Sequence, residues 1–368
     1  MCGIVGGINT GGGMLKGSDF IQAISIQHER GNGLGGGFAA YGIYPEFSQY
    51  YALHIACDNE RAAQEADSFI RMHLYVKIAE DMPTKDVKTI TWHPLLKRYF
   101  TFPGPSNEDL KLSNLGVKTV AEEEAAVDRY MKKFVFDFNI SIKGAYVLSC
   151  GKNMGVFKGV GYPEEIGAFF LIDKLQAPMW IAHSRFPTNT PSWWGGAHPF
   201  SLLNWSVVHN GEITSYGVNR NYLEMFGYKC TLKTDTEVIS YLFDLFVREI
   251  GLSIEDTCTI LSPPLWDEID AGTDPVLKQK LIRLRQYYPQ ALLNGPFAIL
   301  VANGREMIAM NDNLKLRPLV CAREGDKYYF SSEECSFELL CPGREETWML
   351  PGGKPEIVRM KEAVYATT

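Results

Sequence analysis

The chain has 368 residues, of which 46% are apolar and 21% charged, a composition typical of a globular protein with a substantial core. Its formal net charge is −7 and its Lys and Arg residues are scattered, which argues against the basic stripe of a nucleic-acid-binding protein. No apolar run approaches the ~18–20 residues that cross a bilayer, and the first residues lack the basic and apolar regions of a signal peptide. We therefore expect a cytoplasmic protein.

Glycine-punctuated runs of β-branched and aromatic residues predict strands towards both ends of the chain. Those runs cover residues 36–44, 50–57, 179–186 and 205–213. Three other segments predict β-hairpins, because each places a tight turn between two such runs. They cover residues 144–159, with the turn at Lys152-Asn153, 297–311 and 319–332.

Three segments between these strands predict helices, and they cover residues 18–29, 234–250 and 274–288. Ser18 is the expected N-cap of the first helix, and Thr234 with Glu237 has the spacing of a capping box in the second. Because strands cluster at both ends with helices between them, we expect an α+β fold with antiparallel sheets rather than alternating βαβ units.

Residues 59–130 are more charged and are interrupted by proline, so we interpret them as an insertion or small α+β subdomain. The chain has eight cysteines without a C-x-x-C pair, and its seven histidines lack the short spacings of a zinc site. We expect no metal site and expect most cysteines to be reduced core residues.

Two stretches suggest chemistry. The chain begins "MCGIVGG", where Cys2 is either an incidental small residue or a nucleophile whose own α-amine becomes free when Met1 is removed. Residues 183–219, "HSRFPTNTPSWWGGAHPFSLLNWSVVHNGEITSYGVN", are unusually polar and aromatic. Such a segment is costly to order unless it builds a site, although a long surface loop is the alternative interpretation.

In this order, "MCGIVGG", "HSRFPTNT", "AHPF" and "HNGEI" resemble the class II glutamine amidotransferase domain, an N-terminal-nucleophile hydrolase that releases ammonia from glutamine. The segment "MNDNLKLRPLVCAREGDKYYFSSEE" resembles the closing strands of the same family. The residues of these motifs are most similar to those in the glutaminase portion of glutamate synthases. The resemblance implies a four-layer αββα sandwich with two stacked antiparallel sheets, as a single domain over residues 1–368 with the insertion at about 59–130.

The resemblance also implies roles for individual residues. Cys2 would be the nucleophile, and its α-amine, with a reference pKa of about 7.7–8.0, would accept the thiol proton. The Asn210 side chain and the Gly211 backbone N–H would stabilise the oxyanion. Arg185 would grip the α-carboxylate of glutamine, and Asp235 would bind its α-ammonium group.

Further positions match the glutamine pocket of the family: Thr188 and His198, although a buried core histidine is an alternative for His198. Arg30 with Gly31 matches a family pair that closes over the nucleophile, and Gly33 stands where many relatives carry an acid. The glycine-rich loop 30–37 is a candidate gate.

The chain lacks a G-x-G-x-x-G fingerprint and an iron–sulfur cysteine run, so we expect no cofactor in it. The expected function is a stand-alone glutaminase subunit that delivers ammonia to a separate synthase. By resemblance, that partner would be a glutamate synthase subunit with FMN and iron–sulfur clusters, acting on 2-oxoglutarate. The alternatives are a subunit of an N-methylglutamate synthase, a non-glutamine amide hydrolase of the same fold, and an idle scaffolding subunit.

Overall fold

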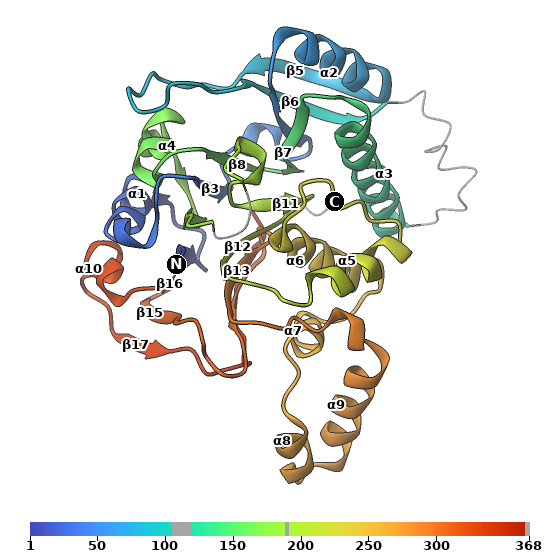
Figure 1. Cartoon of the computed structure of the whole chain (residues 1–368), viewed down its shortest axis with the longest axis vertical. Coiled ribbons are helices and arrows are strands. Elements are labelled where there is room, and N and C mark those ends of the chain that lie inside the picture. The colour runs from blue at the N-terminus through green and yellow to red at the C-terminus, as the bar shows by residue number, and fades with distance from the viewer. Residues whose placement is uncertain (105–118, 188–190, 365–368) are drawn as a thin grey trace.

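The computed structural model describes residues 1–104, 119–187 and 191–364, and in them the protein is α+β (Figure 1). The largest sheet has seven antiparallel strands in the order β17-β15-β16-β1-β10-β3-β8. These strands are β1 (Gly3–Asn9), β3 (Gly36–Tyr41), β8 (Met154–Gly159), β10 (Met179–Ser184), β15 (Val320–Glu324), β16 (Lys327–Ser331) and β17 (Glu346–Met349). The strand that follows Cys2 therefore lies in the middle of the largest sheet.

Two further sheets and one short strand pair complete the β-structure of the described residues. The five-stranded sheet has the order β11 (Phe200–Leu202), β12 (Trp205–Gly211), β13 (Phe297–Ala302), β14 (Glu306–Asn311) and β18 (Glu356–Arg359). The four-stranded sheet has the order β5 (Leu74–Asp81), β6 (Leu95–Pro103), β4 (Tyr51–Cys57) and β7 (Ala145–Lys152). The short pair consists of β2 (Leu15–Lys16) and β9 (Gln176–Ala177).

Ten α-helices occur in the described ranges. They are α1 (Gly17–Ser25), α2 (Glu60–His73), α3 (Val120–Ser141), α4 (Pro163–Phe169), α5 (Tyr216–Met225), α6 (Asp235–Phe243), α7 (Ile254–Leu261), α8 (Trp266–Ala271), α9 (Pro275–Tyr287) and α10 (Phe337–Leu340). Helix α6 continues as a π-helix, Asp244–Glu249, so the predicted helix over 234–250 is confirmed with a change of winding.

The seven- and five-stranded sheets pack face to face. Side chains alternate along each strand, so one face of each sheet points into the shared core and the other points away from it. Ile4 and Ile8 of β1 belong to the same buried cluster as Val208 of β12. Val5 of β1 faces the other way and packs with residues of α1 and α4. Val207 of β12 likewise faces away from the shared core, towards α6. Helices therefore cover the outer faces of both sheets.

The segment predicted to be an insertion, residues 59–130, contains α2, β5, β6 and the first turns of α3. Strand β6 pairs with β5 inside the segment and with β4 before it, and β4 also pairs with β7. The segment thus completes a sheet whose other strands lie outside it. The predicted boundary at about 130 falls within α3, which runs to Ser141.

The hairpins predicted over 297–311 and 319–332 are confirmed, as β13 with β14 and β15 with β16. The hairpin predicted over 144–159 is wrong. Strand β7 pairs with β4 in the four-stranded sheet, whereas β8 pairs with β3 in the seven-stranded sheet. Asn153, at a φ of 51°, joins them, and its side-chain oxygen accepts from the backbone N–H of Tyr44. The turn residues that suggest a hairpin instead connect two sheets.

The predicted cap of the first helix is wrong. Helix α1 begins at Gly17 after Lys16, and the Ser18 hydroxyl donates to the neighbouring Asp19 carboxylate instead of capping the helix. Gly17 suits this tight entry, because an added Cβ would overlap the carbonyl oxygen of Ile172. The 3.6-residue pattern thus located the helix, but the tertiary contact with residue 172 set its first residue.

The predicted cap of α6 is confirmed in part. Thr234 accepts a hydrogen bond from the backbone N–H of Thr236, as an N-cap does. The carboxylate of Glu237 does not return to the cap residue and accepts from the N–H groups of Thr231 and Leu232. Glu237 is buried, and burial raises its pKa to about 7 despite these donors.

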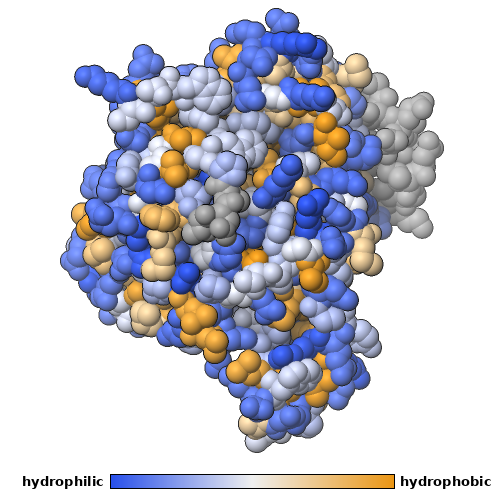
Figure 2. Space-filling view, viewed as in Figure 1, coloured by the Kyte–Doolittle hydropathy of each residue, from blue (hydrophilic) through white to orange (hydrophobic). Residues whose placement is uncertain are grey.

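Helices α8 and α9 project from the rest of the molecule (Figure 1). The predicted helix over 274–288 is confirmed as α9, but none of its residues is buried. Leu265, Val276 and Leu277 are exposed, and apolar side chains are visible on this lobe in Figure 2. Among the described helices, none has both the length and the apolar character that crossing a membrane requires.

All eight cysteines are free, and six of them are buried, which confirms the prediction that most cysteines are core residues. Cys2 is partly buried and Cys335 is exposed.

Candidate active site

Cys2 lies directly before the first residue of β1, at the end of the central strand of the largest sheet. β1 lies between β10 and β16, so the residue before β1 lies next to the ends of both neighbours. Arg30 Nη1 donates to the Cys2 carbonyl oxygen at 3.4 Å, and Arg30 Nε donates to Glu333 at 2.6 Å. Arg30 therefore links the backbone of Cys2 to Glu333, which lies in the "SSEE" segment at the end of β16.

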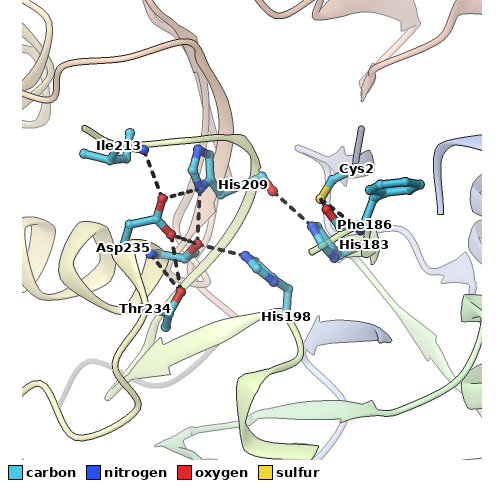
Figure 3. Close-up of polar contacts among 9 residues, drawn as sticks. Cys2, His183, Phe186, His198, His209, Ile213, Thr234 and Asp235 are labelled. Carbon is cyan, nitrogen blue, oxygen red and sulfur yellow. Dashed lines mark hydrogen bonds and ion pairs between the residues drawn. The ribbon is translucent and has the colours of Figure 1, made fainter. Parts of the chain in front are cut away.

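The Cys2 sulfur lies beside the segment that follows β10. The backbone N–H of Phe186 donates to Cys2 Sγ at 3.2 Å (Figure 3). Burial raises the pKa of the Cys2 thiol, while the Phe186 N–H, the N-terminal charge and Arg185 act in the opposite direction. Deprotonation of this thiol therefore requires a base at the site.

A cavity of about 160 Å³ adjoins Cys2. It brings together five of the predicted site residues: Cys2, Arg185, His198, Gly211 and Asp235. A larger cavity of about 490 Å³ contains none of them and lies at the opposite end of β12, against Trp205. We assign the chemistry to the smaller cavity, because Cys2, the predicted nucleophile, lines it together with both charged groups that could bind an amino acid.

Arg185 is buried beside the glycine-rich loop. Its backbone N–H donates to Gly35 O at 2.9 Å, and its carbonyl accepts from Asn32 N–H at 3.2 Å. A Cβ on Gly35 would lie 2.8 Å from Arg185 Cδ, so glycine permits this close approach. Burial lowers the pKa of Arg185, whereas Cys2 and Asp235 oppose that effect. A carboxylate in the cavity would pair with this desolvated guanidinium.

The predicted oxyanion donors lie at the end of β12. Asn210 is buried, and neither its amide nitrogen nor its amide oxygen has a hydrogen-bond partner among the described residues. Gly211 lines the cavity at a φ of 145°. A Cβ at this position would overlap Pro296 O and lie 2.9 Å from Phe297 Cα. An unpartnered buried amide is costly without a ligand. Asn210 itself does not line the cavity, whereas its chain neighbours His209 and Gly211 do.

Asp235, the first residue of α6, accepts hydrogen bonds from several sides. Ile213 N–H donates to Oδ2 at 3.0 Å, and the hydroxyls of Thr234 and Thr236 lie 3.3 Å from Oδ1. His209 Nδ1 is 3.7 Å from Oδ2 (Figure 3). Burial alone would raise the pKa of Asp235, but His209 and these donors lower it to about 2. The carboxylate is therefore ionised at neutral pH and suits an ammonium group.

Two further histidines, His183 and His209, belong to this site, and the sequence analysis predicts no role for either. His183 Nε2 donates to the carbonyl oxygen of His209 at 3.0 Å, and the His183 ring stacks on His198 at a centroid distance of 3.9 Å. Burial lowers the pKa of His183 to about 3 and that of His198 well below 6.5. His198 also fits the alternative interpretation of a buried histidine, although it lines the cavity. Their place in the sequence could have indicated them, because His183 and His209 belong to the same motifs as Arg185 and Asn210.

Thr188 and Gly33 are the two remaining positions that the sequence analysis singles out. Thr188 lies outside the described residues. Gly33 has a φ of 73° and packs against Tyr162, so a glycine at this position meets a backbone requirement.

Comparison with known proteins places this geometry in a family. Residues 118–340 match the description of the class-II glutamine amidotransferases. The chain belongs to this family. The matched residues include Arg185, Asn210, Gly211 and Asp235, whereas Cys2 lies before them.

Individual relatives extend the similarity. The chain is 46% identical to an uncharacterized protein of Archaeoglobus fulgidus over 98% of this chain and 92% of that protein. It is 29% identical to the glutamate synthase [NADPH] large chain of Bacillus subtilis over 51% of this chain. It is 26% identical to the amidophosphoribosyltransferase of Methanocaldococcus jannaschii over 52% of this chain. The chain spans only 13% and 36%, respectively, of those two proteins.

Among solved structures, the allosteric regulatory enzyme of purine biosynthesis matches at 21% identity with a TM-score of 0.38, over 58% of this chain and 41% of that chain.

Proposed function

We propose that this class II glutamine amidotransferase releases ammonia from L-glutamine through a γ-glutamyl thioester on Cys2. The observation that carries the proposal is the cavity that brings the Cys2 side chain together with Arg185, Gly211 and Asp235. A thiol, a cation, an oxyanion-binding backbone and an anion around one small space match the four groups of glutamine that the reaction must engage.

The base in this mechanism is the α-amine of Cys2. With Met1 attached, that nitrogen belongs to an amide and cannot accept a proton, so the mechanism requires removal of Met1. The freed amine takes the thiol proton, and the sulfur bonds to the amide carbon of glutamine. Asn210 and Gly211 hold the resulting oxyanion. The amine then protonates the leaving nitrogen as the C–N bond breaks, and water hydrolyses the thioester to glutamate.

The two charged groups of the cavity select an α-amino acid. Arg185 would hold the α-carboxylate and Asp235 the α-ammonium. A simple amide hydrolase of this fold has no need for both groups, which is why glutamine is preferred over other amides. An idle scaffold is disfavoured because the nucleophile, the unpartnered amide of Asn210 and the charged pair are all retained.

We further infer that the chain acts in the cytoplasm and passes ammonia to a separate synthase subunit. The similarity to part of a glutamate synthase large chain supports glutamate synthase as that partner, with FMN and iron–sulfur clusters in the partner. A subunit of an N-methylglutamate synthase is the second candidate within this function. The helix-covered pair of stacked sheets supports assignment to the αββα sandwich of N-terminal-nucleophile hydrolases.

The test measures ammonia release from L-glutamine by the purified chain after N-terminal mass analysis has established whether Met1 is present. Cys2→Ala should abolish release, while Cys335→Ala, which changes an exposed free cysteine, should not affect it. Turnover by Cys2→Ala would refute the mechanism. Copurification of the native complex, with its flavin content measured, tests the partner. A native chain that copurifies without a flavoprotein would contradict the glutamate synthase assignment.

A further inference from the structure

A buried polar cluster lies beside the residues assigned to glutamine and the oxyanion, and most of its members line the Cys2 cavity. The cluster consists of three histidines and one threonine: His183, His198, His209 and Thr236. His183 lies two residues before Arg185, His209 directly precedes Asn210, and Thr236 directly follows Asp235. The cluster therefore connects the strand β10, which directly precedes Arg185, with the strand β12, which carries Asn210 and Gly211, and with the helix α6, which carries Asp235.

The Thr236 hydroxyl is the centre of this cluster. Its oxygen is 2.8 Å from His198 Nε2, 3.2 Å from His209 Nδ1 and 3.3 Å from Asp235 Oδ1. A hydroxyl has one proton to donate and two lone pairs that accept. Because an ionised carboxylate can only accept, the hydroxyl proton belongs to the bond with Asp235. The two histidines must then donate their N–H groups to the hydroxyl oxygen.

This assignment fixes which ring nitrogen of each histidine donates to the hydroxyl. His198 carries its proton on Nε2 and His209 carries its proton on Nδ1. The other ring nitrogen of His198, Nδ1, has no hydrogen-bond partner among the described residues, which fits an unprotonated nitrogen. His183 donates from Nε2 to the His209 carbonyl, and its Nδ1 likewise has no partner in that part of the chain. Each hydrogen bond of the cluster therefore has one direction. His198 and His209 donate to Thr236, Thr236 donates to Asp235, and His183 donates to the backbone of β12.

We propose that Thr236 is a positioning residue for the amino-acid substrate: its hydroxyl orients the Asp235 carboxylate towards the α-ammonium group. The proposal rests on the proposed function, in which Asp235 binds that ammonium. Thr236 and Thr234 hold Oδ1, while Ile213 N–H holds Oδ2. These donors hold the carboxylate in one orientation, and the Asp235 side chain lines the cavity in which the substrate would lie. Without the Thr236 hydroxyl, the carboxylate can turn away from the cavity.

The test compares two substrates that differ in the group that Asp235 would bind. Glutaramate keeps the carboxylate and the carboxamide of glutamine but lacks the α-ammonium, and release of ammonia reports on both. Thr236→Val should raise KM for L-glutamine by about tenfold or more, with a smaller change in kcat, since a hydrogen bond to a charged group is lost. For glutaramate, kcat/KM should change less than about twofold. Thr236→Ser should restore the wild-type values for both substrates.

The matched control is Thr257→Val. Thr257 is buried on α7, and its hydroxyl donates to Ser253 O at 2.9 Å, but it does not line the Cys2 cavity. This variant should leave both substrates unaffected. If Thr236→Val does not fold, Thr236→Cys supplies a weaker donor of similar size, and the same ratio of the two substrates is measured.

The outcomes separate the proposal from the proposed function. Equal losses for glutamine and glutaramate in the Thr236 variants would overturn the positioning role, since they indicate general damage to the site. Asp235→Asn should raise KM for glutamine, and adding Thr236→Val to it should have little further effect. If Asp235→Asn leaves KM for glutamine unchanged, the ammonium-binding role in the proposed function is wrong. If it raises KM and Thr236→Val does not, only the positioning role fails.

Discussion

Gly211→Ala tests whether the backbone at the oxyanion position must approach its neighbours as closely as the structure shows. Gly211 has a φ of 145°, which L side chains rarely adopt. An added Cβ would overlap Pro296 O and lie 2.9 Å from Phe297 Cα. Both contacts are with backbone atoms at the start of β13, so no side chain can rotate away. Strand β12 must therefore move by roughly 1 Å at the point where the oxyanion donor lies.

The expected loss of activity is large. A misplacement of about 1 Å can reduce a rate by about 10²-fold, and removal of one oxyanion donor costs about 10²–10³-fold in kcat. We expect kcat for ammonia release at saturating glutamine to fall by about two to three orders of magnitude. The free energy of unfolding in urea should fall by about 1–3 kcal/mol, as for other overpacked sites. Mass spectrometry of the N-terminal peptide should show slower formation of the γ-glutamyl adduct.

Gly325→Ala is the matched control, because Gly325 also has a positive φ, of 59°, but an added Cβ would meet no atom within 4 Å. It should lose about 1–2 kcal/mol of stability from the left-handed backbone and keep its activity. The reasoning is refuted if Gly211→Ala keeps kcat within about threefold of wild type and unfolds at the same urea concentration. It is also refuted if the two variants lose activity equally.

Three further outcomes follow from the site. Arg30→Met removes the donor to the Cys2 carbonyl, so kcat should fall about 10–100-fold while the melting temperature changes by only a few degrees; an unchanged kcat would contradict the positioning of Cys2 by Arg30. Burial would raise the pKa of Asp235, but His209 lowers it to about 2, so its stabilising effect is complete above the unfolded pKa of about 3.9 and is lost as the pH falls towards 2. The difference in free energy of unfolding between wild type and Asp235→Asn, measured in urea, should therefore shrink by about 2 kcal/mol as the pH falls through that range. A difference that does not change with pH would contradict this prediction. Burial lowers the pKa of Lys158 to about 7. Wild type should therefore gain free energy of unfolding in urea relative to Lys158→Met as the pH rises from about 7 to 10. A stability difference that stays constant over this range would mean that the amine is solvated.

Local patterns in the sequence predicted the elements well, and tertiary contacts explain where they failed. The runs at 297–311 and 319–332 form hairpins, because consecutive strands joined by a tight turn usually pair. The run at 144–159 has similar turn chemistry, yet its two strands pair with β4 and β3 in different sheets. Turn residues encode a change of direction but not the partner strand, so this crossing could not be derived from local pattern.

The same distinction applies to the site. Motif resemblance identified Cys2, Arg185, Gly211 and Asp235, which line one cavity although up to 233 positions separate them in the chain. It did not reveal the hydroxyl of Thr236 as a shared hydrogen-bond partner, because that role depends on three side chains from separate segments meeting at the cavity wall.

The position of the nucleophile follows from antiparallel pairing around β1. Gly3 of β1 is opposite Ser184, the last residue of β10, and Val5 is opposite Ser331, the last residue of β16. The start of one strand and the ends of its two neighbours therefore meet at one edge of the sheet. Ser332 strengthens this junction, because its hydroxyl accepts from Ile4 N–H at 3.2 Å and its own N–H donates to Ile4 O at 3.0 Å. Cys2 is consequently held by the most central strand pairing of the largest sheet, which explains how a residue at the chain's beginning can be placed firmly enough to act as a nucleophile.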